Sequence, residues 1–317
     1  ADVMTTNFLE NQLSRYQLEY ERLQAINPRL IFAHISGYGD EGPESQRRAF
    51  DVTAWWARSG MMEFVREPGQ TPLSPAPGMG DHSTATALFA AIMSGLYRRE
   101  KTGQGSKVST SLVANGVWAN GMALQGVIAG NDLATHRQET GWVNPFAGCY
   151  ETADGRYVVL TMINTDREYP MLCAALGTQA WLSDPRFESV RLAMRNRVEF
   201  KAAIATAFSK LTYLEASSRL DAQGITYGPV QTMSEVLEDE QLRANGVIVE
   251  TGDAGDDYKL TIGSPINIAG ETKKAPKRAP DIGADSLAVL RSFDLEEAYI
   301  QELLTQGVVV DGSAKAE

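Results

Sequence analysis

The feature that most constrains this fold is an alternation of helical and strand patterns through the first third of the chain. A helical pattern runs from Glu10 to Ala25, ends at Asn27-Pro28, and is followed by a strand pattern from Leu30 to Ile35. A small-residue helix is predicted from Ser83 to Arg99, and a strand from Lys107 to Leu112. Strands separated by helices favour an α/β fold with a parallel, Rossmann-like sheet.

The pattern changes at Cys149, which indicates a second, smaller α+β domain. CYETADGRYVVLTM predicts a hairpin around Asp154-Gly155, a helical region follows, and strands return at Val247–Thr251 and Tyr258–Ile262. The proline-punctuated segment that comes next is predicted to be an extended strap. We therefore expect a large domain over 1–145, a small domain over 146–262, and a strap with a final helix over 263–317 that returns to the large domain.

Two further features of the large domain follow from the pattern. A second small-residue helix is expected from Val113 to Gly130, because small side chains permit close packing. The chain opens on a strand end at Ala1-Asp2-Val3 with no preceding unit, so we expect the large domain to be N-terminally incomplete.

Composition narrows the class of partner. The 317 residues include 29 Lys and Arg against 40 Asp and Glu, a formal net charge of −11, which disfavours nucleic acid and membrane surfaces. Two cysteines without CxxC spacing and three scattered histidines predict a reducing, cytoplasmic location and no metal site. Short, interrupted apolar stretches predict no transmembrane helix. A small molecule is the expected partner.

Asp81 is the first candidate for chemistry. It follows PGQTPLSPAPGMG, which is too rich in proline and glycine to form a regular element, and it precedes the small-residue helix. A carboxylate at a helix start is stabilised by free N–H groups and by the helix dipole, and an ionised carboxylate can attack a thioester. Position alone leaves open the interpretation that Asp81 is only an N-cap.

Ordered sequence blocks along nearly the whole chain carry a family resemblance. They include NFLENQLSRYQLEYERLQAINPRLIFAHISGYGDEGP, the GD before the helix, REKTGQGSKVSTSL, YETADGRYVVL, DPRF, QGITYGPVQTMSEVLEDEQLRANG, GSPINIAG and IGADSLAVLRSF. In this order they resemble the class III (CaiB/BaiF-like) CoA-transferases, the family of formyl-CoA transferase, crotonobetainyl-CoA transferase and α-methylacyl-CoA racemase.

The resemblance implies an enzyme that moves coenzyme A between carboxylic acids through an aspartyl anhydride and an aspartyl-CoA thioester at Asp81. Its expected partners are an acyl-CoA, which takes part as a substrate, and a small carboxylic acid, and no metal is expected. The resemblance further implies two chains interlocked as rings in a homodimer. By the family's spacing, the implied CoA-binding residues are Asn7, Phe8, Leu9, Arg15, Arg48, Ala49, Phe50 and Asp51.

Some departures from the family leave alternatives open. The positions of the racemase acid and base hold Phe50 and Asn164, which cannot exchange a proton, although His34 and His82 are alternative bases. A non-catalytic relic or partner subunit is a further alternative. The family's glycine-rich loop is replaced by QETGWVNPFAGCY, where Gly141, Trp142 and Asn144 are the candidates to serve in its place.

Overall fold

The large lobe, residues 1–141, is built on a parallel sheet, as the alternating pattern predicts. The computed structural model describes all residues except 74, 142, 253–257 and 313–317. Strands β1 (Val3–Thr6), β2 (Ile31–Ser36) and β3 (Ser106–Ser111) are parallel and lie in the order β1-β2-β3. The chain is therefore a mixed α/β protein with a parallel sheet and additional antiparallel sheets.

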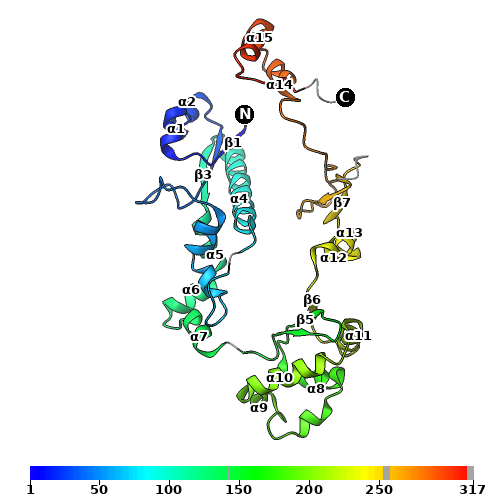
Figure 1. The fold of residues 1–317 in the computed structure, drawn as a ribbon. Coiled ribbons are helices and arrows are strands. Elements are labelled where there is room, and N and C mark those ends of the chain that lie inside the picture. The colour runs from blue at the N-terminus through cyan, green and yellow to red at the C-terminus, as the bar shows by residue number, and fades with distance from the viewer. Residues whose placement is uncertain (74, 142, 253–257, 313–317) are drawn as a thin grey trace.

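Helix α4 (Met79–Thr102) runs beside this sheet (Figure 1). A glycine makes the close approach possible, because a Cβ at Gly95 would lie only 3.3 Å from side-chain atoms of Ile31 and Val108. Ile31 is fully buried at this contact. The long helix is thus fixed on β2 and β3, and its direction brings its N-terminus toward the carboxyl ends of the strands.

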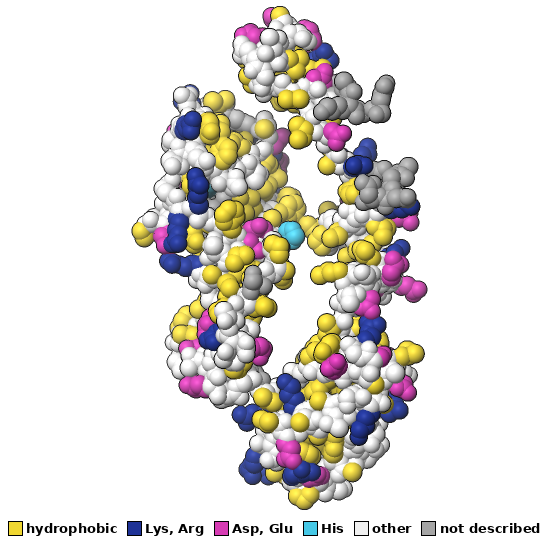
Figure 2. Space-filling view, viewed as in Figure 1, with side chains coloured by type: hydrophobic (Ala, Val, Ile, Leu, Met, Phe, Trp, Pro, Cys, Tyr) yellow, Lys and Arg dark blue, Asp and Glu magenta, His cyan; other side chains and the backbone are white. Residues whose placement is uncertain are grey.

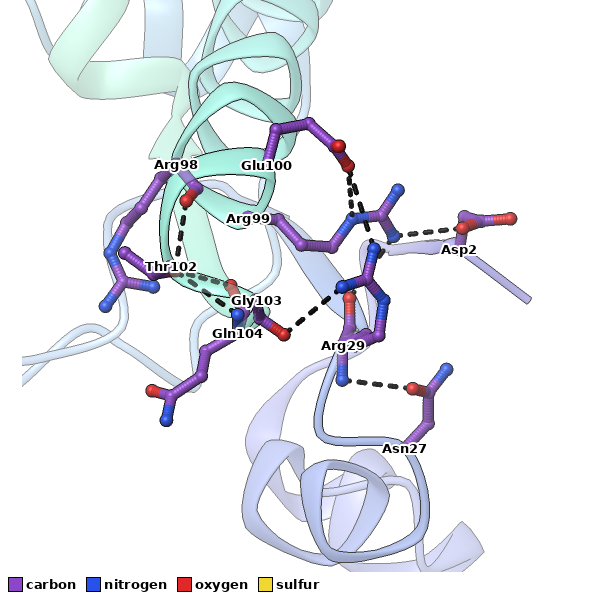
Figure 3. A network of polar contacts seen from close by, with 9 residues as sticks. All are labelled: Asp2, Asn27, Arg29, Arg98, Arg99, Glu100, Thr102, Gly103 and Gln104. Atoms are coloured by element: carbon purple, nitrogen blue, oxygen red, sulfur yellow. Dashed lines mark hydrogen bonds and ion pairs between the residues drawn. The ribbon is translucent and has the colours of Figure 1, made fainter.

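A polar network fixes the opposite end of α4 (Figure 3). The guanidinium of Arg99, which is almost buried, donates to Asp2 Oδ1 over 3.0 Å and to the Arg29 carbonyl over 3.3 Å. Arg29 also donates to the Gly103 carbonyl and lies 3.7 Å from Glu100. The start of β1, the turn before β2 and the end of α4 are joined at this edge, away from the carboxyl ends of the strands.

Two predicted helices are each divided in the structure, so both predictions of a single helix were wrong. The Glu10–Ala25 pattern forms α1 (Glu10–Tyr16) and α2 (Tyr20–Ile26), because Gln17 adopts a left-handed conformation with φ 57°. The Val113–Gly130 pattern forms α5 (Leu112–Ala119) and α6 (Gly121–Ile128). Between them Asn120 leaves helical geometry, and its side chain donates to the Ser59 carbonyl.

The segment before α4 contains a π-helical element that the sequence did not predict, η1 (Asp51–Ala57), and a short helix, α3 (Met61–Phe64). Helix α4 itself begins four residues before the predicted start at Ser83, with Gly78 as its N-cap residue. After α6, helix α7 (Leu133–Thr140) is capped by the Asp132 carboxylate.

The small lobe, residues 146–229, has a core of its own. The predicted hairpin is confirmed: β4 (Cys149–Glu151) and β5 (Tyr157–Leu160) are antiparallel, and β6 (Tyr227–Pro229) pairs with β5. Aromatic rings of Phe146, Tyr169, Trp181 and Phe187 surround Phe200 with centroid separations of 5.0–5.6 Å. The helical elements around this core are α8 (Thr165–Leu176), η2 (Gln179–Ser183), α9 (Val190–Arg195), α10 (Arg197–Phe208) and α11 (Tyr213–Gln223).

The rest of the chain runs back from the small lobe toward the level of the sheet (Figure 1). It contains α12 (Met233–Glu238), α13 (Glu240–Ala244) and the antiparallel pair β7 (Ile248–Glu250) and β8 (Leu260–Ile262), in agreement with the two predicted strands. The strap, residues 263–280, forms no helix or strand. It leads to α14 (Ser286–Ser292) and α15 (Glu297–Thr305).

The two lobes and the strap surround an opening, which side chains leave unfilled in the space-filling view (Figure 2). Across the part of the chain that the structure describes, none of the helices combines the length and apolar character needed to span a bilayer.

Candidate active site

A cavity of about 620 Å³ lies where the three parallel strands end. Asn7 follows β1, Gly37 follows β2 and Leu112 follows β3, and all three residues line it. The carboxyl edge of a parallel sheet is where open α/β proteins bind ligands, because the loops that leave the strands converge there. The topology therefore marks this cavity as the candidate site.

Most of the residues that the sequence assigned to a site meet in this cavity. Its other lining residues include Gln46 and Ser36, which the sequence did not single out. The predicted residues that line it are Asn7, Leu9, Arg48, Ala49, Phe50, Asp51 and Asp81.

Phe8 and Arg15 do not line this cavity, and each lies near the ring of Tyr16. The Phe8 ring lies 5.6 Å from the Tyr16 ring, and the Arg15 guanidinium lies 5.6 Å from the same ring. Phe8 is also flanked in the chain by Asn7 and Leu9, which do line the cavity. The structure thus places Phe8 and Arg15 around the Tyr16 ring, and only the chain neighbours of Phe8 belong to the cavity wall.

Asp81 is the third residue of α4, and the N-cap interpretation was wrong. The N-cap position belongs to Gly78, whose φ of 84° suits glycine. Asp81 is exposed and lines the cavity, and its carboxylate has no hydrogen-bond or ion-pair partner among the described residues. In the first turn of a 24-residue helix the free N–H groups and the dipole favour negative charge. An unpartnered carboxylate is thus held facing open space.

The carboxylate that does cap α4 is Asp51, at the start of η1. Its Oδ2 accepts from the Gly78 N–H over 2.8 Å and its Oδ1 from the Gly80 N–H over 3.0 Å. Asp51 is 5% exposed, so these two bonds form in a largely dry environment. The side chain therefore fixes the first turn of α4, and with it the position of Asp81. The sequence missed this role because the bonded residues are 27 and 29 positions away.

Gly80 allows that contact. A Cβ there would lie 2.2 Å from Asp51 Oδ1 and 2.4 Å from Trp55 Cγ, closer than real atoms approach. Another side chain at this position has no space unless α4 and η1 separate. The Gly80-Asp81 pair thus combines a residue that must be small with a residue that faces the cavity.

Two neighbouring cations at the cavity differ in their partners. Arg47 donates to Glu44 over 2.7 Å and lies over the Tyr38 ring. Arg48, in contrast, pairs with no carboxylate within the described parts of the chain. An exposed guanidinium without an internal counter-ion is available for an anionic ligand, and its planar donor array suits phosphate.

A second polar cluster lies next to the cavity, and of its members the sequence named only His34, as an alternative base. Glu10, His34 and Asp40 bring oxygen and nitrogen atoms within 4.8 Å of one another, as metal ligands do. The Lys107 ammonium, however, already lies 3.1 Å from Asp40 and 3.6 Å from Glu10. A lysine thus supplies the positive charge that these two carboxylates require. The members come from distant parts of the chain, so no local spacing could indicate the cluster.

The candidates for the glycine-rich loop lie elsewhere. Gly141 ends helix α7, and the Asn144 side chain accepts a hydrogen bond from the Phe146 N–H. Neither residue is part of the cavity wall. Trp142 lies outside the described residues.

Comparison with known proteins finds a family and relatives that match most of the chain. The model of CoA-transferase family III matches residues 1–286. The (R)-2-hydroxy-4-methylpentanoate CoA-transferase of Clostridioides difficile is 28% identical over 98% of this chain and 77% of its own length. The cinnamoyl-CoA:phenyllactate CoA-transferase of Clostridium sporogenes is 29% identical over 96% of this chain and 74% of its own. A crystal structure of a CaiB/BaiF family protein from Brucella suis has a TM-score of 0.78 at 24% identity, over 92% of this chain and 75% of that one.

The parallel sheet with a ligand-sized cavity at its carboxyl edge, and an aspartate facing that cavity from a helix N-terminus, define an α/β protein with a candidate small-molecule site. The chain belongs to CoA-transferase family III, the CaiB/BaiF family, and is an enzyme of the CoA-transferase class.

Proposed function

We propose that this enzyme transfers coenzyme A between carboxylic acids, with Asp81 as the covalent nucleophile. The observation that carries the proposal is that Asp81 shares one cavity with Asn7, Leu9 and Arg48, three of the residues that the family's spacing assigns to CoA. Arg48 is the cation best placed for the CoA phosphates, with Arg15 and Phe8 for the adenosine end. In an acidic protein, fixed arginines are what holds such an anion.

The proposed reaction balances in four steps. The Asp81 carboxylate attacks the thioester carbonyl of the donor, which forms a mixed anhydride and expels CoA thiolate. The thiolate attacks the aspartyl carbonyl, which releases the donor acid and leaves an aspartyl-CoA thioester. The acceptor carboxylate attacks that thioester to form a new anhydride and thiolate. Attack of the thiolate on the acceptor acyl carbonyl gives the new acyl-CoA and regenerates the Asp81 carboxylate.

The position of Asp81 suits this cycle. Each attack by or on Asp81 needs an unobstructed carboxyl group, and this side chain is exposed in the cavity without a partner among the described residues. The helix N-terminus stabilises the negative charge that returns to Asp81 in the last step, when thiolate attack on the acceptor acyl carbonyl breaks the second anhydride.

The racemase alternative loses one of its two candidate bases. His34 is buried, with both ring nitrogens engaged by Phe8 and Asp40, so it cannot take a proton from a substrate. Nothing in the cavity favours a racemase over a transferase, and the relic interpretation has no observation of its own. Transfer of coenzyme A between carboxylic acids is therefore the function that we propose.

The relatives suggest that the acids exchanged are small carboxylic acids. Their names mention 2-hydroxy-4-methylpentanoate, phenyllactate, glutarate and oxalate. We propose a small carboxylic acid as acceptor and an acyl-CoA as donor, in the cytoplasm and without a metal. A panel of these acids with acetyl-, succinyl- and cinnamoyl-CoA, followed by mass spectrometry of the CoA products, identifies the pair.

We also propose the domain division and the oligomeric state that the sequence predicted. The domains span 1–145, 146–262 and 263–317, and two chains form an interlocked homodimer. The separate core of the small lobe and the opening bounded by the strap support them (Figure 2).

The substitution Asp81→Asn tests the nucleophile. An amide cannot form the anhydride, so we expect turnover to fall by several orders of magnitude, as is usual when a covalent nucleophile is removed. The melting temperature should barely move, because the carboxylate has no partner among the described residues to lose. Ser83→Ala, two residues along α4, is the control and should retain activity.

Trapping locates the covalent intermediate. Wild-type enzyme incubated with acyl-CoA and hydroxylamine should carry a hydroxamate at Asp81, detected by peptide mass spectrometry. An adduct on another residue, or an Asp81→Asn enzyme with substantial turnover, would falsify the assignment.

A further inference from the structure

His34 makes two short contacts deep in the large lobe. It lies on β2 and is 2% exposed. Its Nε2 is 2.9 Å from the Phe8 carbonyl oxygen, and its Nδ1 is 2.8 Å from Asp40 Oδ1. Phe8 belongs to the segment 7–9, which leaves β1, and Asp40 belongs to the loop that leaves β2. One side chain therefore joins two of the loops at the carboxyl edge of the sheet.

Both ring nitrogens of His34 are within hydrogen-bond distance of an oxygen atom. A carbonyl oxygen only accepts, so the contact with Phe8 forms when Nε2 carries a hydrogen. The contact of Nδ1 with Asp40 Oδ1, at 2.8 Å, joins the ring to a carboxyl group on the loop after β2.

The chain of contacts continues through Lys107 to the first residue of α1. Lys107 Nζ lies 3.1 Å from Asp40 Oδ2 and 3.6 Å from Glu10 Oε1. Burial disfavours the charged lysine, but hydrogen bonding to Asp40 and the charges of Asp40 and Glu10 outweigh it, so the pKa of Lys107 is raised. The lysine therefore remains charged and holds both carboxylates.

These contacts hold the segment 7–9 from both sides. The Phe8 carbonyl is bound by His34 and the Phe8 N–H donates to Thr6 Oγ1, while Glu10, directly after the segment, is bound by Lys107. Asn7 and Leu9, on either side of Phe8, line the cavity.

We propose that His34 is a positioning residue for coenzyme A. Directly through the Phe8 carbonyl, and through Asp40 and Lys107 to Glu10, it fixes the segment 7–9 in the conformation that binds the nucleotide. The inference rests on the proposed function, since it assumes that this segment contacts CoA. His34 lies behind the cavity wall and touches no reacting atom, so its loss weakens binding of acyl-CoA and leaves the chemical step intact.

The test compares three variants of the full chain. His34→Leu removes both hydrogen bonds at similar volume, and Asp40→Asn, at a partly exposed position, removes the charge from the same chain of contacts. The control is Ile31→Val, which removes one methyl group from a buried residue of the same strand on the opposite face of the sheet.

Calorimetric titration with CoA, steady-state kinetics and hydrogen exchange are measured on each variant. We expect the dissociation constant of CoA and the KM for acyl-CoA to rise about tenfold in His34→Leu and about threefold in Asp40→Asn. The kcat value should stay within about twofold. Without ligand, amide exchange of a peptide covering residues 7–13 should accelerate in both variants, and Ile31→Val should match wild type in affinity and exchange.

The outcomes separate the two proposals. Wild-type protein that fails to bind CoA overturns the proposed function and the role of His34 that depends on it. Wild-type protein that binds CoA, with unchanged affinity and exchange in the variants or an equal loss in Ile31→Val, overturns only the role of His34. If His34→Leu does not fold, Asp40→Asn decides the result alone.

Discussion

At the scale of single residues, the site depends on a glycine as much as on a carboxylate. Gly80 lies between Asp51 and Trp55, where an added Cβ has no room. We expect Gly80→Ala to lower the free energy of unfolding by about 1–3 kcal/mol, the usual range for overpacking, and to reduce turnover because the first turn of α4 must shift. Urea denaturation and initial rates measure the two effects.

The control for Gly80→Ala is Gly121→Ala, at the first residue of α6. A Cβ there would meet no atom within 4 Å, so alanine should be neutral or slightly stabilising. Equal losses of stability in the two variants would mean that the contact with Asp51 and Trp55 does not set the cost, because helix propensity alone favours alanine at both positions.

Asp51 supplies a second prediction at this scale. In Asp51→Asn, the amide NH₂ must face one of the two N–H groups of Gly78 and Gly80, so one bond is lost and a buried donor remains unpaired. We expect a loss of about 1–3 kcal/mol in unfolding free energy and a lower kcat.

Kinetics then separate the two roles of Asp51. A side chain that positions Asp81 affects kcat, whereas the CoA contact implied by the family's spacing affects the KM for acyl-CoA. A variant with normal stability and normal kcat but a raised KM would exclude the capping role.

At the scale of elements, local signals predicted much of the fold and failed where distant residues decide. The Asp154-Gly155 hairpin was predicted because turn chemistry resides in two adjacent residues. The start of α4 was not, because Gly78-Met79-Gly80 is a poor helix start by composition. Its free N–H groups are satisfied by Asp51, which no local pattern connects to them.

The same distinction between local signals and distant contacts explains which residues of the site could be predicted. Asp81 and Arg48 could be found from family spacing, but the cluster of Glu10, His34, Asp40 and Lys107 could not. Its members are brought together by the parallel pairing of β2 with β3 and by the loop that returns to α1. The division of the predicted 10–25 helix likewise depends on one left-handed residue, Gln17, which is not glycine.

Helix α8 and strand β4 carry the two cysteines in opposite environments, which predicts their reactivity. Burial raises the pKa of the Cys173 thiol to about 11, despite opposing hydrogen bonds with Tyr169 and Thr178, so at pH 8 it stays protonated and unreactive. Cys149 is exposed. A thiol titration at pH 8 should find one fast-reacting thiol per native chain, mapped to Cys149, and two after denaturation. Rapid native labelling of Cys173 would show that α8 opens.

At the scale of the whole molecule, large apolar side chains are exposed on the lobe that carries the site. Phe89 and Tyr97 on α4, Trp118 on α5, and Met122 and Ile128 on α6 are 48–87% exposed. Clusters of such side chains are a usual sign of a protein interface. Together with the opening in Figure 2, they support the proposal that two copies associate and that each passes through the other.

Interlocking makes a prediction that an ordinary dimer does not share. Interlocked chains cannot separate while both remain folded and intact, so light scattering should find a dimer that persists when the protein is diluted to nanomolar concentration. A protease site inserted into the exposed strap between residues 270 and 280 offers a way to open the ring. After cleavage, the same dilution should release monomers.

Wild-type protein treated with the protease, and the variant treated with inactivated protease, are the controls and should remain dimeric. A monomer at micromolar concentration rules out the dimer, and an uncut dimer that dissociates on dilution rules out the interlocking while leaving the cavity and Asp81 unaffected.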